Sequence, residues 1–159
     1  MQRLDKLTIS SIMPIQLLEG FSWTEDLTVR QVQMLAPYFS VYEASTDTAI
    51  IHEGDKVEFF GVIYEGVAEV VKENFSGSAK VLSAIRPGKT FGEMGFFDKQ
   101  PASASIAVKK NAILLVMTKN DFEALASESP ALALVLLIKI LRGMSARLRE
   151  TSGKLIDLI

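Results

Sequence analysis

Between residues 41 and 118 the chain consists of short apolar stretches separated by turn-forming residues. The breaks hold glycine, proline, asparagine or aspartate, which is the pattern of an antiparallel all-β unit. Many short strands with regular breaks indicate a sandwich, a barrel or a roll. We expect strands at Val41–Ala44, Ala49–Ile51, Phe59–Tyr64, Val67–Val71, Lys80–Ile85, Ser103–Val108 and Ala112–Met117.

Residues 1–40, which precede this region, read as short helices. Thr28 and Gln31 have the spacing of a capping box at the start of the run Val29–Ala36. A proline disfavours helical geometry in the residue before it, so Pro37 should end that helix. The sequence therefore predicts N-terminal helices packed beside the strands.

Residues 119–159 also read as helical. Thr118 is placed to cap a short helix that ends near Ser127. Ser129 is placed to cap a longer helix with Pro130 in its first turn, where proline is tolerated. If this helix runs to about Asp157, it is roughly 40 Å long at about 1.5 Å per residue. That length exceeds what a small β-roll can cover.

The composition restricts the class of protein. The 159 residues are enough for one domain, and 48% of them are hydrophobic, which indicates a folded chain. The net charge of −2 gives no overall attraction to nucleic acid or anionic lipid. Cysteine is absent, which excludes disulfides and thiolate metal sites. The strongest apolar run, Ala131–Leu141, is shorter than the roughly 20 residues of a membrane span. We expect a soluble, cytoplasmic protein.

The segment Phe91–Ile106 carries the most specific signal. Gly88, Gly92 and Gly95 permit positive φ or close backbone approach, and Met94–Phe97 has the length of one helical turn. A turn whose N–H groups converge forms an anion site, and Glu93 at its start can accept hydrogen bonds from a sugar hydroxyl. The alternative explanation of the same local pattern is a β-bulge followed by a turn whose glutamate is solvated.

This segment resembles the phosphate-binding cassette of cyclic nucleotide-binding domains, which occur in catabolite-activator transcription factors, cyclic-nucleotide-dependent kinases and gated channels. The resemblance extends to the early strands, with Ile51–Asp55, Phe60–Ile63 and Gly66, and to the turn Ile85–Gly88. Asp121 and Phe122 with Leu125 are similar to the short penultimate helix of the family. Several ordered motifs at matching spacing are more specific than any one of them.

The resemblance implies a set of ligand-binding residues. Gly92 and Met94 would offer backbone N–H groups to a cyclic phosphate, and Glu93 would hold the ribose 2′-hydroxyl. The implied set comprises Phe91, Gly92, Glu93, Met94, Ala102, Ser103, Ala104, Thr151 and Ser152. The last two are similar to the Thr-Ser pair by which the catabolite-activator helix reaches the purine, at a position about four residues later than the spacing predicts. The implied ligand is a cyclic nucleotide such as cAMP or cGMP, with no cofactor and no metal.

The sequence departs from the family at Ala102, where the phosphate-pairing arginine should stand. An arginine–phosphate fork is charge-assisted and bidentate, and its loss costs on the order of 2–4 kcal/mol of binding. Three readings stay open. The domain binds no cyclic nucleotide, it holds the phosphate with another group such as Lys99 or an arginine of the last helix, or it takes a different ligand such as a cyclic dinucleotide.

The last helix carries a heptad pattern. Leu134, Leu141, Leu148 and Leu155 are spaced by seven, and Leu137, Met144, Thr151 and Leu158 each follow by three. This a/d seam predicts a homodimer with Leu134, Leu137, Leu141, Met144, Leu148 and Leu155 at the interface. The alternative is a helix that packs only on its own β-roll. Arg142, Arg147 and Arg149 are expected on the outer helix face, with an inward Arg147 as the alternative in a dimer.

Other residues give no catalytic set. His52 is the only histidine and has no second histidine or cysteine nearby, so a strand-face residue is favoured over a metal ligand or base. Trp23, near Phe21 and Phe39, is expected in the core. We therefore expect no enzyme.

Together these observations predict an α+β fold. Residues 1–40 form N-terminal helices, residues 41–118 an eight-stranded antiparallel β-roll of the jelly-roll type, and residues 119–159 two C-terminal helices, all in one domain. We expect a regulatory sensor in which ligand in the roll is coupled to the last helix. The alternative is a degenerate roll that serves as a dimerising interaction scaffold. No helix-turn-helix domain follows before Ile159, so we expect a downstream protein partner rather than direct DNA binding or a membrane.

Overall fold

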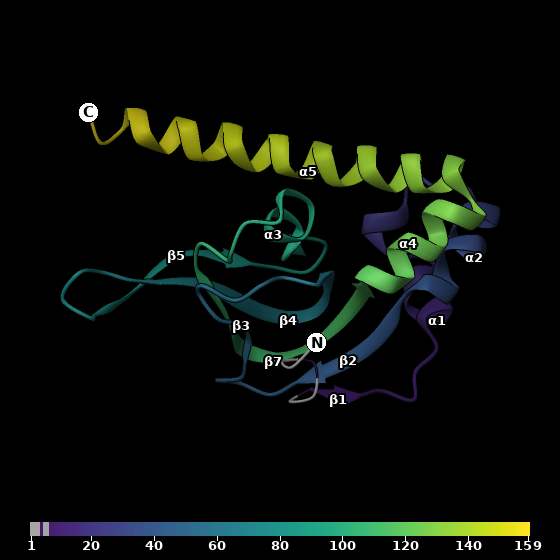
Figure 1. Cartoon of the computed structure of the whole chain (residues 1–159), viewed down its shortest axis with the longest axis horizontal. Helices are drawn as coiled ribbons and strands as arrows, with labels where there is room; N and C mark the ends of the chain where they lie inside the picture. Colours follow the sequence, from purple (N-terminus) through teal and green to yellow (C-terminus); the bar gives the residue numbers. More distant parts are fainter. Residues whose placement is uncertain (1–3, 5–6) are drawn as a thin grey trace.

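The computed structural model describes Leu4 and residues 7–159, which form a β-roll with helices at one end and a long helix across the top (Figure 1). The strands are β1 (Thr8–Ile9), β2 (Ser40–Ala44), β3 (Ala49–Ile51), β4 (Phe59–Glu73), β5 (Ala79–Ile85), β6 (Thr90–Phe91) and β7 (Ser105–Thr118). The helices are α1 (Pro14–Leu18), α2 (Val29–Leu35), α3 (Glu93–Asp98), α4 (Lys119–Glu128) and α5 (Pro130–Ile156), with short 3₁₀ turns η2 (Ser22–Thr24) and η3 (Ala36–Tyr38).

All strand pairs are antiparallel. The sheet order is β1-β2-β7-β4-β5, with β3 paired to β7 and β6 paired to β4. The described residues form seven strands, so the predicted number of eight is wrong. The antiparallel roll with N-terminal helices and a long C-terminal helix is confirmed.

Two of the predicted strand breaks are bends within long strands. The break expected at Gly66 lies inside β4, and the break expected at Lys110-Asn111 lies inside β7. The two bends face each other, because Val67 pairs with Lys110 and the register shifts on both sides of Gly66. Gly66 has φ +87°, and a Cβ there would lie 2.3 Å from the Asn111 carbonyl oxygen. Glycine therefore lets two long strands bend together and close the roll.

Hydrophobic side chains form two cores. One fills the inside of the roll with buried residues such as Ile50, Ile63, Phe91 and Leu114. The other lies between the outer face of the sheet and the helices. Trp23 belongs to this second core, where its ring meets Phe39 edge-on at 6.0 Å, so its predicted burial is confirmed.

The helix boundaries follow local signals. Thr28 and Gln31 form the predicted capping box, and α2 ends at Leu35, two residues before Pro37. Thr118 caps α4 by accepting from the Asp121 N–H. Ser129 makes no side-chain capping bond to α5, so that prediction is wrong; its carbonyl accepts from the Ala133 N–H and Pro130 opens the helix.

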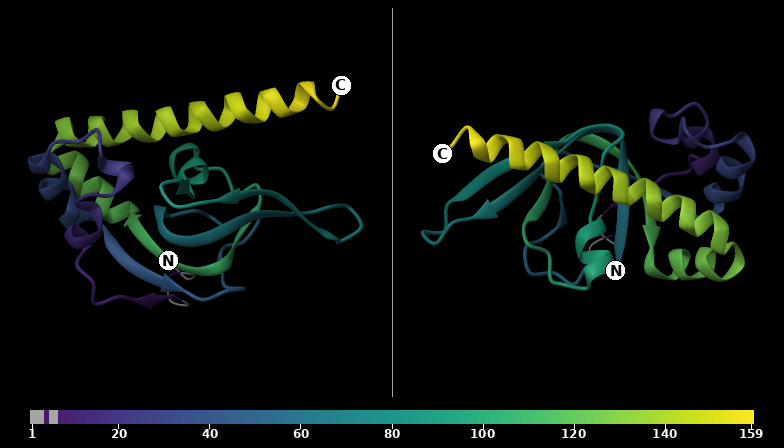
Figure 2. Two further views of the ribbon diagram at one scale, coloured as in Figure 1. Left: turned by 180° about the vertical axis from the view of Figure 1, so that it is seen from behind. Right: turned by 90° about the horizontal axis from the view of Figure 1, so that it is seen from above.

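Helix α5 has 27 residues and passes over α3 and along β5 (Figures 1 and 2). In its first half, one face of the helix is buried; the buried residues are Leu132, Ala133, Leu136 and Ile140. The opposite face exposes the apolar residues Leu134, Ile138, Leu141, Leu148 and Leu155, which are spaced by three, four or seven; we call them the α5 seam. Met144 is partly buried against the core of its own chain, and its predicted place in a dimer interface, like that of Leu137, stays a prediction.

Candidate functional site

The centre of the site is the turn from β6 into α3. Gly92 has φ +76° and precedes the first residue of α3, so its backbone turns the helix start toward the inside of the roll. A Cβ at Gly92 would lie 2.9 Å from the Phe59 carbonyl oxygen. The first N–H groups of a helix have no partner within the helix. The turn therefore presents N–H groups where the sequence predicted an anion cradle; we use "cradle" for the turn Gly92–Met94 and the facing segment Ala102–Ala104.

Glu93 at the start of α3 is buried, with 1% of its surface exposed, and it is paired. Its Oε1 accepts a hydrogen bond of 2.6 Å from Nη1 of Arg147 on α5. Nη2 of the same guanidinium donates to the carbonyl oxygen of Thr90 at 2.9 Å and to its hydroxyl at 3.3 Å. Arg147 thus ties the last helix to the predicted sugar-binding carboxylate within one chain. Its expected place on the outer helix face is wrong.

The facing segment contains no arginine at the predicted position. Ala102 is held by its backbone, which donates to the Asp55 carbonyl and accepts from the Gly54 N–H. The next carbonyl, that of Ser103, accepts a hydrogen bond of 2.7 Å from Nζ of Lys72 on β4. Lys72 lies on the same face of β4 as Ala68 and Val70, which belong to the core inside the roll. A cation from β4 therefore reaches the segment that lacks its own arginine.

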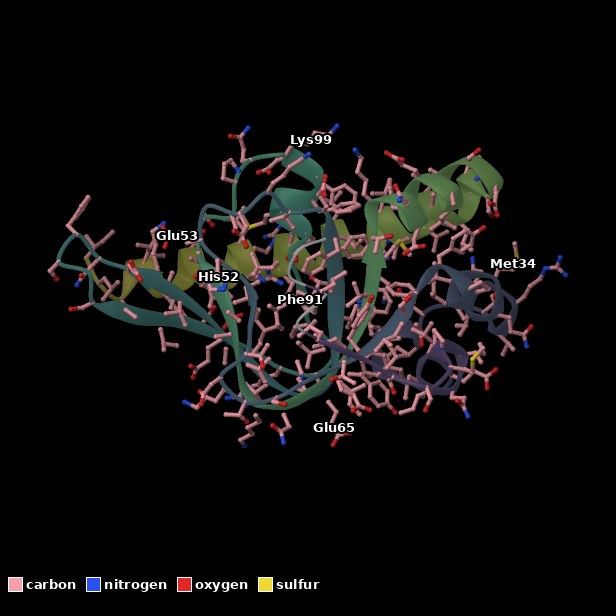
Figure 3. All side chains as sticks on the ribbon, turned by 60° about the horizontal axis from the view of Figure 1, so that its bottom comes forward. Met34, His52, Glu53, Glu65, Phe91 and Lys99 are labelled. Carbon is pink, nitrogen blue, oxygen red and sulfur yellow. The ribbon has the colours of Figure 1, made fainter. Side chains whose placement is uncertain are left out.

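The other predicted residues divide between exposed and buried positions. Met94 is half exposed, and Ser103 and Ala104 lie directly before β7. The Phe91 side chain is buried inside the roll, where it touches Gly61, so it shapes the cradle from below and does not face it (Figure 3). Lys99, at the end of α3, lines a separate apolar cavity of about 330 Å³ with Phe96 and Phe122.

Thr151 and Ser152 are both exposed near the end of α5. The Thr151 hydroxyl donates to the Arg147 carbonyl oxygen at 2.9 Å, one turn back along the helix. Thr151 therefore lies one turn C-terminal to the arginine that binds Glu93. Thr151 lines the same groove as Thr90 and Arg147, whereas the Ser152 side chain forms no hydrogen bond within the part of the chain that the structure describes.

Sequence reasoning missed Lys72 and Thr90 and misplaced Arg147. The signal for Arg147 was present in the helix periodicity. Leu136, Ile140 and Met144 form a stripe spaced by four, and Arg147 continues it by three. Lys72 carries no such signal, because its contact with the Ser103 carbonyl depends on how β4 pairs with β7.

The remaining chemistry of the site is simple. Among the residues that the structure describes, no group of three or more histidine, cysteine or acidic side chains could hold a metal ion. In that same part of the chain, no helix is both long and apolar enough to cross a membrane. The site therefore contains a cradle at a helix start and one buried carboxylate, Glu93, which Arg147 contacts. A second cation, Lys72, contacts the facing segment at the Ser103 carbonyl.

The curated relatives of this chain are regulatory proteins by name. The Cyclic AMP receptor protein of Thermus thermophilus is 25% identical over 138 residues, which cover 87% of this chain and 62% of the relative. The cAMP-dependent protein kinase regulatory subunit of Yarrowia lipolytica is 28% identical over 100 residues, which cover 63% of this chain and 26% of the relative. The chain spans less than two thirds of the length of these relatives.

Solved structures share the fold. A cyclic nucleotide-binding domain from Methylobacillus flagellatus KT matches 92% of this chain and 83% of its own, with a TM-score of 0.80 and 23% identity. The Thermus thermophilus Catabolite Activator Protein matches 86% of this chain and 62% of its own, with a TM-score of 0.71 and 24% identity. The family model described as cyclic nucleotide-binding domain matches residues 42–129, more than half of the chain. This chain is a member of the cyclic nucleotide-binding domain family.

Proposed function

We propose that the protein is a non-catalytic sensor in which a cyclic nucleotide in the cradle changes the position of α5. The observation that carries this proposal is the bond between Glu93 Oε1 and Arg147 Nη1. A ribose hydroxyl that binds Glu93 competes with Arg147 or joins it, and either event acts directly on α5. A ligand shifts a conformational equilibrium only through different affinities for the two states, and this contact supplies such a difference.

The phosphate in this proposal is held without an arginine at position 102. Lys72 Nζ lies 2.7 Å from the Ser103 carbonyl oxygen and 3.7 Å from Glu53 Oε1, and an ammonium group has three protons to donate. Lysine binds phosphate as a point charge and lacks the bidentate geometry of arginine. We therefore expect weaker binding of cAMP or cGMP than in a domain with the arginine.

The output of the sensor is proposed to pass through a homodimer formed by the α5 seam. Leu141 and Leu148 are 64% and 68% exposed in the single chain, which is unusual for two leucines on one helix stripe. A second copy packed through the same stripe would bury both. Motion of α5 would then change the dimer geometry that a downstream protein partner recognises.

A second candidate is a scaffold with an empty cradle. The observation that favours it is the same ion pair, because Arg147 already satisfies Glu93 without any ligand. Ala102 adds to this reading, since the strongest phosphate contact of the family is missing. A third reading within the same class is that the domain takes a cyclic dinucleotide in place of cAMP.

Titration calorimetry with cAMP and cGMP separates the sensor from the scaffold. The wild type and Ala102→Arg should both release or absorb heat, with tighter binding in the variant because the arginine fork is restored. Ala102→Gln, which adds a side chain of intermediate length without charge, is the matched control and should not tighten binding. Absence of heat in both the wild type and Ala102→Arg would rule out the cradle as a cyclic nucleotide site.

A further inference from the structure

A cavity of about 330 Å³ lies between α3, the start of α4 and residues 56–58 before β4, and none of the cradle residues lines it. Its walls are apolar and are formed by Val57, Phe96, Phe97 and Phe122. The volume is at the lower end of the roughly 300–1,000 Å³ of small-molecule sites. An apolar cavity of roughly 150 Å³ takes benzene, so this one has room for a ring with a short side chain.

The three phenylalanines of the wall form an ordered cluster. The rings of Phe96 and Phe97 meet edge-on with their centroids 4.8 Å apart, and Phe122 meets them edge-on at 5.7 Å and 5.5 Å. All three side chains are only partly buried in the single chain. Aromatic rings prefer such tilted contacts with other rings, so an aromatic ring in the cavity would extend the cluster and cover its exposed surface.

The rim of the cavity is charged, with one cation in excess. Lys56 Nζ lies 3.0 Å from Glu58 Oε1, and Lys119 Nζ lies 3.9 Å from Glu123 Oε1. The ammonium group of Lys99 forms no hydrogen bond or ion pair with the described residues. The rim therefore complements a ligand that carries a single negative charge.

The backbone of Lys99 is unusual for a lysine. It ends α3 in the left-handed conformation, with φ +59°, at the outer end of that helix (Figure 3). Glycine or asparagine usually occupies such a position, because a Cβ crowds the backbone there. The contact that closes the helix, from the Lys99 N–H to the Gly95 carbonyl oxygen at 3.1 Å, needs no lysine side chain. A strained position that the fold does not assign to lysine supports a role for its charge.

We infer that this cavity binds an aromatic monocarboxylic acid, with its ring against the three phenylalanines and its carboxylate at Lys99 Nζ. The inference goes beyond the proposed function and does not rest on it, since no cradle residue takes part. Helix α3 begins at the cradle and α4 leads into α5, so the acid would bind where these two helices meet. It would give the domain a second ligand site, separate from the cradle.

The test is an NMR titration of the full chain with 3-phenylpropionate, in which the amide signals of α3 and α4 are followed. Saturable shifts at Phe96, Phe97 and Phe122 should give a dissociation constant of about 1 mM or lower, as expected for a ligand of this size. The neutral 3-phenylpropanamide has the same ring and should bind roughly fivefold more weakly or worse, because it lacks the charge-assisted contact. The saturated 3-cyclohexylpropionate should also bind more weakly, because it lacks the ring contacts.

Two variants separate the charge from the ring. Lys99→Asn keeps a residue that tolerates the left-handed conformation, so the fold should be no less stable, and the acid and the amide should bind about equally. Lys110→Asn makes the same change in net charge at an exposed residue of β7 and should preserve the preference for the acid. Phe122→Leu should weaken the acid and the amide together.

Several outcomes would overturn this assignment. They are equal binding of acid and amide by the wild type, loss of the preference in Lys110→Asn, and no saturable shift at about 10 mM acid. Binding of 3-cyclohexylpropionate as tight as that of the aromatic acid would overturn the aromatic class. Shifts of the same amides on dilution without ligand would show that a second copy covers the cavity, which would also overturn it.

A competition experiment distinguishes this inference from the proposed function. Saturating cAMP with Ala102→Arg should leave the acid bound, and displacement of the acid by cAMP would place it in the cradle and overturn the inference. Binding of the acid by a chain that binds no cyclic nucleotide would support the cavity and count against the proposed function alone.

Discussion

Glu93 and Arg147 are 54 positions apart in the sequence, yet their side chains meet at 2.6 Å. Glu93 is buried at the start of α3, while 41% of the Arg147 side chain is exposed on α5. The pair therefore links the inside of the roll to a helix whose remaining C-terminal residues are exposed. A buried carboxylate needs a partner, so the position of α5 and the state of the cradle depend on each other.

Replacement of Arg147 by methionine should destabilise the fold. The change keeps most of the side-chain stem but leaves the Glu93 carboxylate buried without its partner, at a cost of about 2–4 kcal/mol. Urea unfolding at neutral pH measures the free energy difference. Arg149→Met, at an exposed position two residues along α5, should change it by less than about 0.5 kcal/mol.

A double-mutant cycle checks the cause of that loss. If the unpaired carboxylate is responsible, the double variant Glu93→Gln, Arg147→Met should lose clearly less free energy of unfolding than the two single variants lose in sum. Additive costs would show that the two residues act independently.

Gly92 should not tolerate a side chain. Gly92→Ala places a Cβ 2.9 Å from the Phe59 carbonyl oxygen and 3.1 Å from Ile51 Cδ1, in a residue with φ +76°. The conformational penalty alone is about 1 kcal/mol, and the contact adds to it. Gly77→Ala is the matched control, because Gly77 has φ +81° and nothing lies within 4 Å of a Cβ there. Thermal unfolding should show a larger loss for Gly92→Ala, and equal losses would contradict the close approach at the cradle.

The α5 seam should set the oligomeric state. Leu141→Asp and Leu148→Asp each place a charge in the proposed helix interface, so light scattering should report a monomer for both variants and a dimer for the wild type. Arg149→Asp introduces an acid on α5 outside the seam and should remain dimeric. A wild type that is already monomeric at micromolar concentration would contradict the dimer.

The contact between Asp26 and Lys139 should contribute a pH-dependent stability. The hydrogen bond from Lys139 lowers the pKa of Asp26 below its ordinary range. A carboxyl group whose pKa is lower in the folded state stabilises the fold above its unfolded pKa of about 3.9, and this contribution is lost as the pH falls through the folded value.

Asp26→Asn should therefore lower the stability at pH 7 by up to about 1 kcal/mol, as expected for a partly exposed pair. The difference from the wild type should shrink as the pH falls below about 4. Melting temperatures between pH 7 and pH 3 measure this, with Glu25→Gln as the neighbouring control. A difference that stays constant across this range would exclude the ion pair as its source.

The strands and most helix ends were predictable because their causes are local. The apolar stretches, the capping boxes at Thr28 and Thr118, and Pro37 each act within a few residues. The number of strands was not predictable, since the bends at Gly66 and Asn111 depend on two strands that curve together.

The candidate site was predictable only in part. Gly92 and Glu93 could be predicted because they belong to a motif within one segment. Lys72 and Arg147 reach the cradle from distant elements, β4 and α5. Their directions depend on strand register and on the angle at which α5 crosses α3. Neither quantity is encoded in the spacing of residues near the cradle.

Hydrogen–deuterium exchange along α5, with and without a cyclic nucleotide, tests the coupling of cradle and helix most directly. The measurement uses the wild type and Ala102→Arg at saturating cAMP. We predict a change in amide protection that is centred on Arg147 and extends toward Ile156, together with a change at the start of α3. Binding of cAMP that alters protection at α3 and leaves α5 unchanged would contradict it.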